Sequence, residues 1–396
     1  MRPRPDSLAV AALLTALVAL GPLSTDMYLP ALPILMRNFG AGVAPAQFTL
    51  SVFLIGFAFG QLLVGPLSDR FGRRPVLLWG MALYAVASVG CASAGDFQQL
   101  TLARLFQSLG ACCGPVLGRA VVRDVYGRER AARMFAYMAM AMAAAPAVAP
   151  MIGGFLTQWP GWRGIFLALG LVGAALAAAT AAMLSETNPH LCPEAVRPGR
   201  LLANYLMLLS NRTYAGYVLC FAGVFSSLFA FISGSSFVLI DRFGLSPVRY
   251  GLSFGMVVLG YMAGSFLSGR LTQRLGIARM IVLGLAVGTG GGLLGLALTL
   301  AGADTVPAIV GPVALVMVGA GLVLPNAMAG AIAPFGEMAG TASALLGFAQ
   351  MLCAALGGMA IAHFGAAGAL PMMLGIALTN LLAVLAYFTL VGRRPG

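Results

Sequence analysis

The chain has 396 residues, of which 60% are hydrophobic and only 9% charged, and its mean hydropathy is +0.95. A water-soluble domain cannot hide that much apolar surface, so the composition excludes the soluble classes and indicates an integral membrane protein. The net charge of +12 is carried entirely by arginine, and the absence of lysine excludes a P-loop and lysine Schiff-base chemistry.

Twelve apolar runs are long enough to cross a membrane, which takes about 20 residues. The polar stretch Ser185–Ser210 separates the first six runs from the last six. We expect an all-α membrane protein of twelve transmembrane helices: an N-terminal six-helix bundle (1–184), a cytoplasmic connecting loop (185–211) and a C-terminal six-helix bundle (212–396). The runs lie near 8–30, 46–66, 76–94, 99–123, 132–157, 162–184, 212–240, 248–269, 277–300, 306–328, 339–364 and 368–390.

Arginine is distributed unevenly between the two sets of loops that join these runs. Seventeen arginines lie on the side of the two termini and four on the opposite side. The side with more arginine faces the cytoplasm by the positive-inside rule, so both termini are expected there. Because the arginines lie in short turns rather than on one basic face, nucleic acid is not expected as a partner.

Asp26 is the only carboxylate inside an apolar run, near the expected outer end of the first helix. An ionised carboxylate in hydrocarbon costs several kcal/mol, which makes Asp26 a candidate functional residue. The alternative is a solvated residue that ends the helix before Pro30. Arg104, in the fourth run, is expected at a matching depth and forms with Asp26 the candidate proton-coupling pair. Here the alternative is an ion pair that only docks two helices.

The turn Gly65–Pro75 places four charged residues between two long apolar runs, where only a membrane surface can hold them. A weaker copy, Gly264–Gly276, recurs about 200 residues later, with Ser268 at the position expected to match Asp69. A turn repeated in two halves of a hydrophobic chain is typical of a duplicated transporter.

Further candidates line the expected interior. Aromatic side chains in the seventh run form either a cavity wall or ordinary packing, and both alternatives stay open. The stretch Pro146–Gly154 concentrates helix-bending prolines and close-packing glycines in the fifth run. The predicted substrate-cavity residues are Met27, Tyr28, Gln107, Phe225, Phe229, Asn326 and Gln350.

Two histidines and six scattered cysteines provide no metal-ligand spacing and no catalytic constellation. We therefore expect no catalytic residue, no metal and no cofactor, and hence not an enzyme.

These motifs resemble the major facilitator superfamily over nearly the whole chain. Gly65–Arg74 resembles its signature loop, Arg104-Leu105-Phe106-Gln107 the helix 4 motif of proton antiporters, and Pro146, Pro150, Gly153 and Gly154 their helix 5 motif, with Ala149 where a glycine is usual. Ser24–Pro33, Arg123–Tyr126 and Met338–Ser343 are similar to the Bcr/CflA branch of bicyclomycin and chloramphenicol exporters.

The resemblance implies a proton-coupled exporter of small drug-like compounds that works by alternating access as a monomer in the bacterial inner membrane. It also implies a gate in which Asp69 docks on the start of the eleventh helix in the outward-open state. The alternatives are a narrow exporter of one metabolite and a non-transporting membrane sensor. The gate residues are Gly65, Asp69, Arg70, Gly72, Arg73, Arg74, Arg123, Asp124 and Gly340.

Overall fold

A computed structural model describes residues 7–125, 134, 138, 145, 148–188, 191, 198–303, 305–363 and 368–391, and every regular element among them is helical. Ten of these helical segments are long and apolar enough to cross a membrane. The expected fifth helix (132–157) lies largely outside the described residues, although residues 148–158 are helical.

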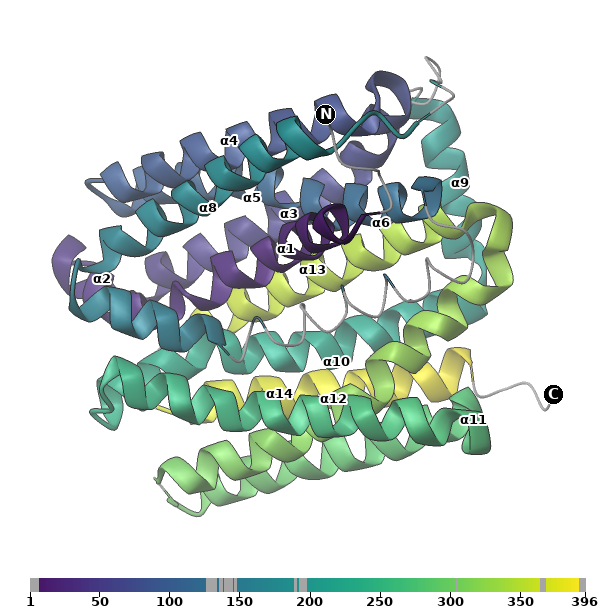
Figure 1. Ribbon diagram of the computed structural model, residues 1–396. Helices are drawn as coiled ribbons and strands as arrows, with labels where there is room; N and C mark the ends of the chain where they lie inside the picture. The colour runs from purple at the N-terminus through teal and green to yellow at the C-terminus, as the bar shows by residue number, and fades with distance from the viewer. Residues whose placement is uncertain are drawn as a thin grey trace. The chain divides into compact units, whose positions relative to one another are not determined.

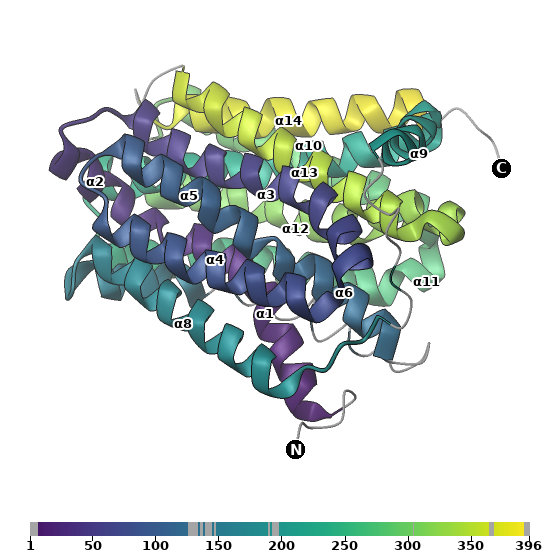
Figure 2. The same cartoon turned by 90° about the horizontal axis from the view of Figure 1, so that it is seen from above.

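The chain divides into two compact units, and the first contains Met1–Ala31 and Val52–Leu201. Within it α4 packs between α5 and α8, as Figure 2 shows. Arg104 and Gln107 lie on α5, and the break at Cys112 separates α5 from α6 inside one apolar span. The helices of this unit are α1 (Leu8–Asp26), η1 (Leu29–Ala31), the inner part of α3 (Val43–Phe71), α4 (Arg73–Ser93), α5 (Phe97–Ala111), α6 (Cys113–Val125) and α8 (Trp162–Met183).

The second unit contains Leu32–Ser51 and Leu202–Gly396. Its core lies where α10 packs against α12, α13 and α14. The expected connecting loop contains a helix, α9, which begins at Pro198. The elements of this unit are α2 (Leu32–Phe39), the outer part of α3, α9 (Pro198–Ser210), α10 (Arg212–Ser236), η3 (Phe237–Arg242), α11 (Pro247–Leu300), α12 (Val306–Ile332), η4 (Ala333–Met338), α13 (Ala339–His363) and α14 (Leu370–Leu390).

The first apolar span is longer than the sequence predicts. The α-helix α1 ends at Asp26, but the apolar span continues through η1 and α2 to Phe39. Pro30 and Pro33, which lack an N–H group, disrupt the regular helix without ending the span. Asp26 is the last residue of α1, and its depth in the membrane stays a prediction.

Two glycines make the sharp turns between paired helices in the two halves. Gly276, with φ 80° and ψ 161°, divides α11 into two helices that fold back on each other (Figure 1). Gly72, with φ 98° and ψ 156°, joins α3 to α4 in the same conformation, which favours glycine. The two positions are 204 residues apart, so Gln273 rather than Ser268 corresponds to Asp69. The predicted register of the repeat is thus corrected by five residues.

Close packing repeats with the same spacing. A Cβ atom on Gly80 would contact the backbone of Gly110, and a Cβ atom on Gly284 would contact the backbone of Gly319. Gly80 and Gly284 are again 204 residues apart, and each lies on the helix that follows its turn. In both halves a glycine therefore lets the helix after the turn pack closely against a neighbouring backbone, as expected for a duplicated bundle.

Candidate proton-coupling and gating sites

Asp26 is buried, with only 2% of its surface exposed. Its carboxylate accepts a hydrogen bond of 3.0 Å from the Thr25 hydroxyl. The alternative of a solvated residue at the outer surface is therefore wrong. A buried carboxyl group is stable only with a proton, a partner or access to water, so Asp26 stays the candidate proton-coupling residue.

Arg104 is fully buried beside the same part of α1. Its Nη1 donates to the carbonyl oxygen of Ser24 at 2.9 Å and to Oε1 of Gln107 at 2.8 Å. The guanidinium carbon lies 4.2 Å from the ring centre of Phe53 and 4.9 Å from that of Tyr28, at cation–π distances. Arg104 therefore ties α5 to the end of α1.

The expected direct ion pair between Arg104 and Asp26 is not among the ion pairs of the described residues. Instead, Nε and Nη2 of Arg104 are buried without a hydrogen-bond partner there. Arg104 reaches the backbone two residues before Asp26 rather than its carboxylate. The unused donors of this buried cation leave capacity for a new acceptor.

Sequence reasoning missed the polar chain that continues from Arg104 into α4. The Gln107 amide donates to the Ser88 hydroxyl at 2.8 Å, and Tyr84 shares a 2.6 Å hydrogen bond with the Ser24 side chain. Tyr84 and Ser88 are one helical turn apart on α4, and this i, i+4 spacing of polar residues in an apolar helix was the available signal. Three helices thus meet on one buried polar network.

The described part of the helix 5 motif packs against the residue that follows Asp26. A Cβ atom on Gly153 would collide with the Met27 carbonyl group, so only glycine permits this approach of backbones. Pro150 and Gly154 are buried beside it, and Pro146 lies outside the described residues. The helix 5 motif therefore contacts the segment that carries Asp26.

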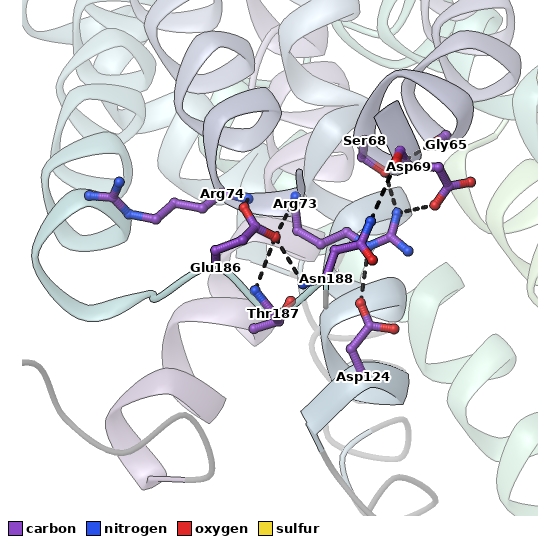
Figure 3. Close-up of polar contacts among 9 residues, drawn as sticks. All are labelled: Gly65, Ser68, Asp69, Arg73, Arg74, Asp124, Glu186, Thr187 and Asn188. Atoms are coloured by element: carbon purple, nitrogen blue, oxygen red, sulfur yellow. Dashed lines mark hydrogen bonds and ion pairs between the residues drawn. The ribbon is translucent and has the colours of Figure 1, made fainter. Parts of the chain in front are cut away.

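Arg73, the first residue of α4, lies at the centre of the charged turn Gly65–Pro75 (Figure 3). Its Nη1 donates to the Asp69 carboxylate and to the Ser68 hydroxyl, and its Nε donates to Asp124 at 3.0 Å. The Ser68 hydroxyl in turn donates to the Gly65 carbonyl oxygen at 2.7 Å. Asp124 thus forms an ion pair with Arg73.

Glu186, which the sequence analysis did not single out, holds this turn from the other side. Its carboxylate accepts from the backbone N–H groups of Arg73 at 2.9 Å and Arg74 at 3.1 Å, the first amides of α4 (Figure 3). Helix N-termini carry unpaired amides and partial positive charge, so a carboxylate there caps the helix. A Cβ atom on Gly72 would collide with this carboxylate. Glycine is thus required both for its backbone conformation and for the cap.

The remaining predicted gate residues have fewer polar contacts than Arg73 among the described residues. The Arg74 side chain donates to the Ala181 carbonyl oxygen at 3.0 Å, and Arg70 lies over the Phe71 ring at 5.0 Å. The side chain of Arg123 and the surroundings of Gly340 lie outside the described part. Docking of Asp69 on the start of α13 stays a prediction.

The predicted cavity residues fall into two groups. Tyr28, Met27 and Gln107 are buried in the packing of the first unit. Asn326 is also buried, and its side chain bonds with Ser268 at 2.7 Å and Thr272 at 3.1 Å, so a role toward substrate requires those bonds to open.

The second group lies on α10 and α13. The Phe225 ring is 5.1 Å from that of Phe229 and 6.4 Å from that of Phe221. Gln350 is half-buried on α13. Their role as a cavity wall stays a prediction.

Comparison with known proteins agrees with this architecture. The sequence model described as Major Facilitator Superfamily matches residues 14–358. The chain belongs to the Major Facilitator Superfamily. Among its relatives is a chloramphenicol resistance protein of Pseudomonas aeruginosa, 33% identical over 85% of this chain and 80% of that protein. A bicyclomycin resistance protein homologue of Haemophilus influenzae is 29% identical over 94% of both chains.

The fold of this superfamily member is shared with a solved D-xylose–proton symporter. The TM-score is 0.75 at 15% identity, over 98% of each chain. At this identity the likeness concerns the fold alone. The protein is thus a multi-pass membrane protein with the major facilitator fold.

Proposed function

We propose that this protein exports small drug-like compounds from the bacterial cytoplasm in exchange for protons. The observation that carries the proposal is the buried carboxyl group of Asp26, at the end of the helix whose Ser24 carbonyl oxygen the buried Arg104 contacts. The resistance-protein relatives support the direction of transport and the substrate class. The partners proposed are small molecules and protons, and the working unit is a monomer.

In the proposed cycle, Asp26 carries the proton. A protonated carboxyl group is neutral and tolerates burial, whereas the ionised group requires the unused donors of Arg104 or water. Because Arg104 contacts the Ser24 carbonyl oxygen, and Gly153 contacts the Met27 backbone, a change at Asp26 acts on α5 and on the segment around residue 153. That coupling links proton binding to helix movement.

Substrates are expected to be neutral or mildly polar and partly aromatic. In the Phe221–Phe225–Phe229 ladder on α10 the first two rings are stacked at 6.4 Å and the last two are tilted at 5.1 Å. Phe225 is the least buried of the three and is the ring proposed to contact flat apolar molecules. One candidate carboxylate does not demand a cationic substrate. The narrow-specificity exporter remains the second candidate.

A resistance profile in an efflux-deficient host tests the proposal. Expression is expected to raise the inhibitory concentration of several chemically unrelated compounds, and a protonophore is expected to remove the difference. An unchanged profile across a broad panel contradicts multidrug export. In that case, efflux of a single metabolite would favour the narrow exporter, and no efflux at all would favour the sensor.

We further propose that the protein lies in the inner membrane with both termini in the cytoplasm, because 17 loop arginines lie on that side and four on the other. A reporter enzyme fused after Ser185 is expected to show cytoplasmic activity, and one fused after Gly95, in the turn before α5, periplasmic activity. The reverse pattern would overturn the orientation.

A further inference from the structure

The turn inside α11 has arginines without acidic partners. Arg270, Arg274 and Arg279 are exposed, and α11 contains no Asp or Glu in its 54 residues. None of the three belongs to an ion pair of the described residues. The corresponding turn of the first half differs, because there Arg73 binds Asp69 and Asp124. Three exposed arginines that are in no ion pair of the described residues therefore lie around one turn.

An apolar hollow lies directly beside these charges. It is a shallow, open surface region along one helix, lined by Leu275, Ala278, Arg279, Val282 and Leu283. Val282 and Leu283 are 39% and 48% exposed on a helix that spans the membrane, so this wall faces lipid. Arg279 is the one charged residue of the lining. The hollow thus combines an apolar floor with a cation at its rim.

An aromatic ring and a further arginine, Phe266 and Arg270, precede Arg274 on the same helix. The guanidinium carbon of Arg270 lies 4.4 Å from the centre of the Phe266 ring, and Phe266 is 58% exposed. Aromatic rings and arginines gather at the level of lipid headgroups. The turn therefore presents cations at headgroup level and apolar side chains just below it.

We propose that this turn binds an anionic phospholipid, with its phosphate held by Arg274 and Arg279 and an acyl chain in the hollow. The inference rests on the proposed orientation, which places the turn at the cytoplasmic leaflet, where anionic lipids attract basic residues. Guanidinium groups bind phosphate through paired N–H donors, and no neighbouring carboxylate of α11 competes for them.

Lipid binding to the purified, delipidated protein tests the proposal without any transport measurement. Phosphatidylglycerol is expected to bind more tightly than phosphatidylcholine. The double variant Arg274→Gln/Arg279→Gln is expected to weaken phosphatidylglycerol binding roughly 25-fold, since each arginine near an anionic surface contributes about a fivefold gain. Arg249→Gln, ~40 Å away at the other end of the same helix, removes one exposed charge and is expected to leave binding unchanged.

The variant Ala278→Phe distinguishes binding of a lipid from binding of a free anion. It fills the hollow but keeps every arginine, so it is expected to weaken phosphatidylglycerol binding while the protein elutes as a folded monomer. Millimolar inorganic phosphate is expected not to displace the lipid. The proposal is overturned if the double variant binds like the wild type, or if both lipids bind equally. It is also overturned if phosphate displaces the lipid while Ala278→Phe has no effect. These lipid-binding results do not depend on drug export, so a failure of the proposed export function would not change them.

Discussion

Replacing Asp26 with asparagine is expected to abolish proton-driven export, reducing drug resistance to that of cells without the transporter. The amide cannot take up or release a proton, and Asp26 is the one buried carboxylate of the described residues. Insertion and folding are expected to persist, because the amide oxygen still accepts the Thr25 hydrogen bond. Such a change typically lowers the free energy of unfolding by about 1 kcal/mol or less. Drug efflux driven by an imposed pH gradient in proteoliposomes measures the effect.

Asp96→Asn provides the matched control for this variant. It removes a carboxylate of the same chain from the turn before α5, where the Asp96 side chain accepts from the Gln99 amide as a helix cap. Asparagine caps a helix about as well as aspartate, so wild-type efflux is expected. Gradient-driven efflux by Asp26→Asn would show that protons cross by another route.

The second large effect is expected at Asp69. Asp69→Asn is expected to shift the population toward the inward-open state, because the proposed docking of a carboxylate on the start of α13 is lost. A carboxylate at a helix N-terminus contributes roughly 0.3–2 kcal/mol, a shift of about 2- to 30-fold in the conformational equilibrium. The buried Arg73–Asp124 pair stays in place, so the first unit is expected to remain folded. Distances between spin labels at the cytoplasmic ends of the two halves, in a background without native cysteines, measure the shift.

Gln273→Asn is the control for this measurement, because Gln273 occupies the corresponding position beside the turn at Gly276. It shortens an exposed neutral side chain, and the distance distribution is expected to match the wild type. If Asp69→Asn also matched the wild type while export failed, the docking hypothesis would be rejected and the turn would have another role.

The sequence predicted the helical spans and the two turns, because long apolar runs and charged glycine turns are local signals. It placed the end of the first span too early, because Pro30 and Pro33 interrupt the helix while the run Leu29–Leu35 stays apolar. The repeat was misaligned because Gly264 and Gly269 both precede a plausible match for Asp69, and only the positive φ of Gly276 decides between them.

The missed residues of the sites are those whose roles depend on rotation and distance. Depth along two helices indicated that Arg104 and Asp26 lie at similar levels, but it cannot say which way each side chain points. Arg104 in fact reaches the Ser24 carbonyl oxygen. Glu186 was missed because the amides that it caps are more than 110 residues earlier in the chain.

The glycines spaced 204 residues apart also bear on how such a protein evolves. Gly72 and Gly276 keep one backbone turn, and Gly80 and Gly284 keep one helix crossing, while the side chains around them differ. A gene for a single half would have to use the same turn on both sides of its dimer, with the same charges on each. Once the halves are fused, one copy can retain Asp69 while the other carries Gln273 at no cost to the shared backbone. Duplication thus freed each turn to specialise.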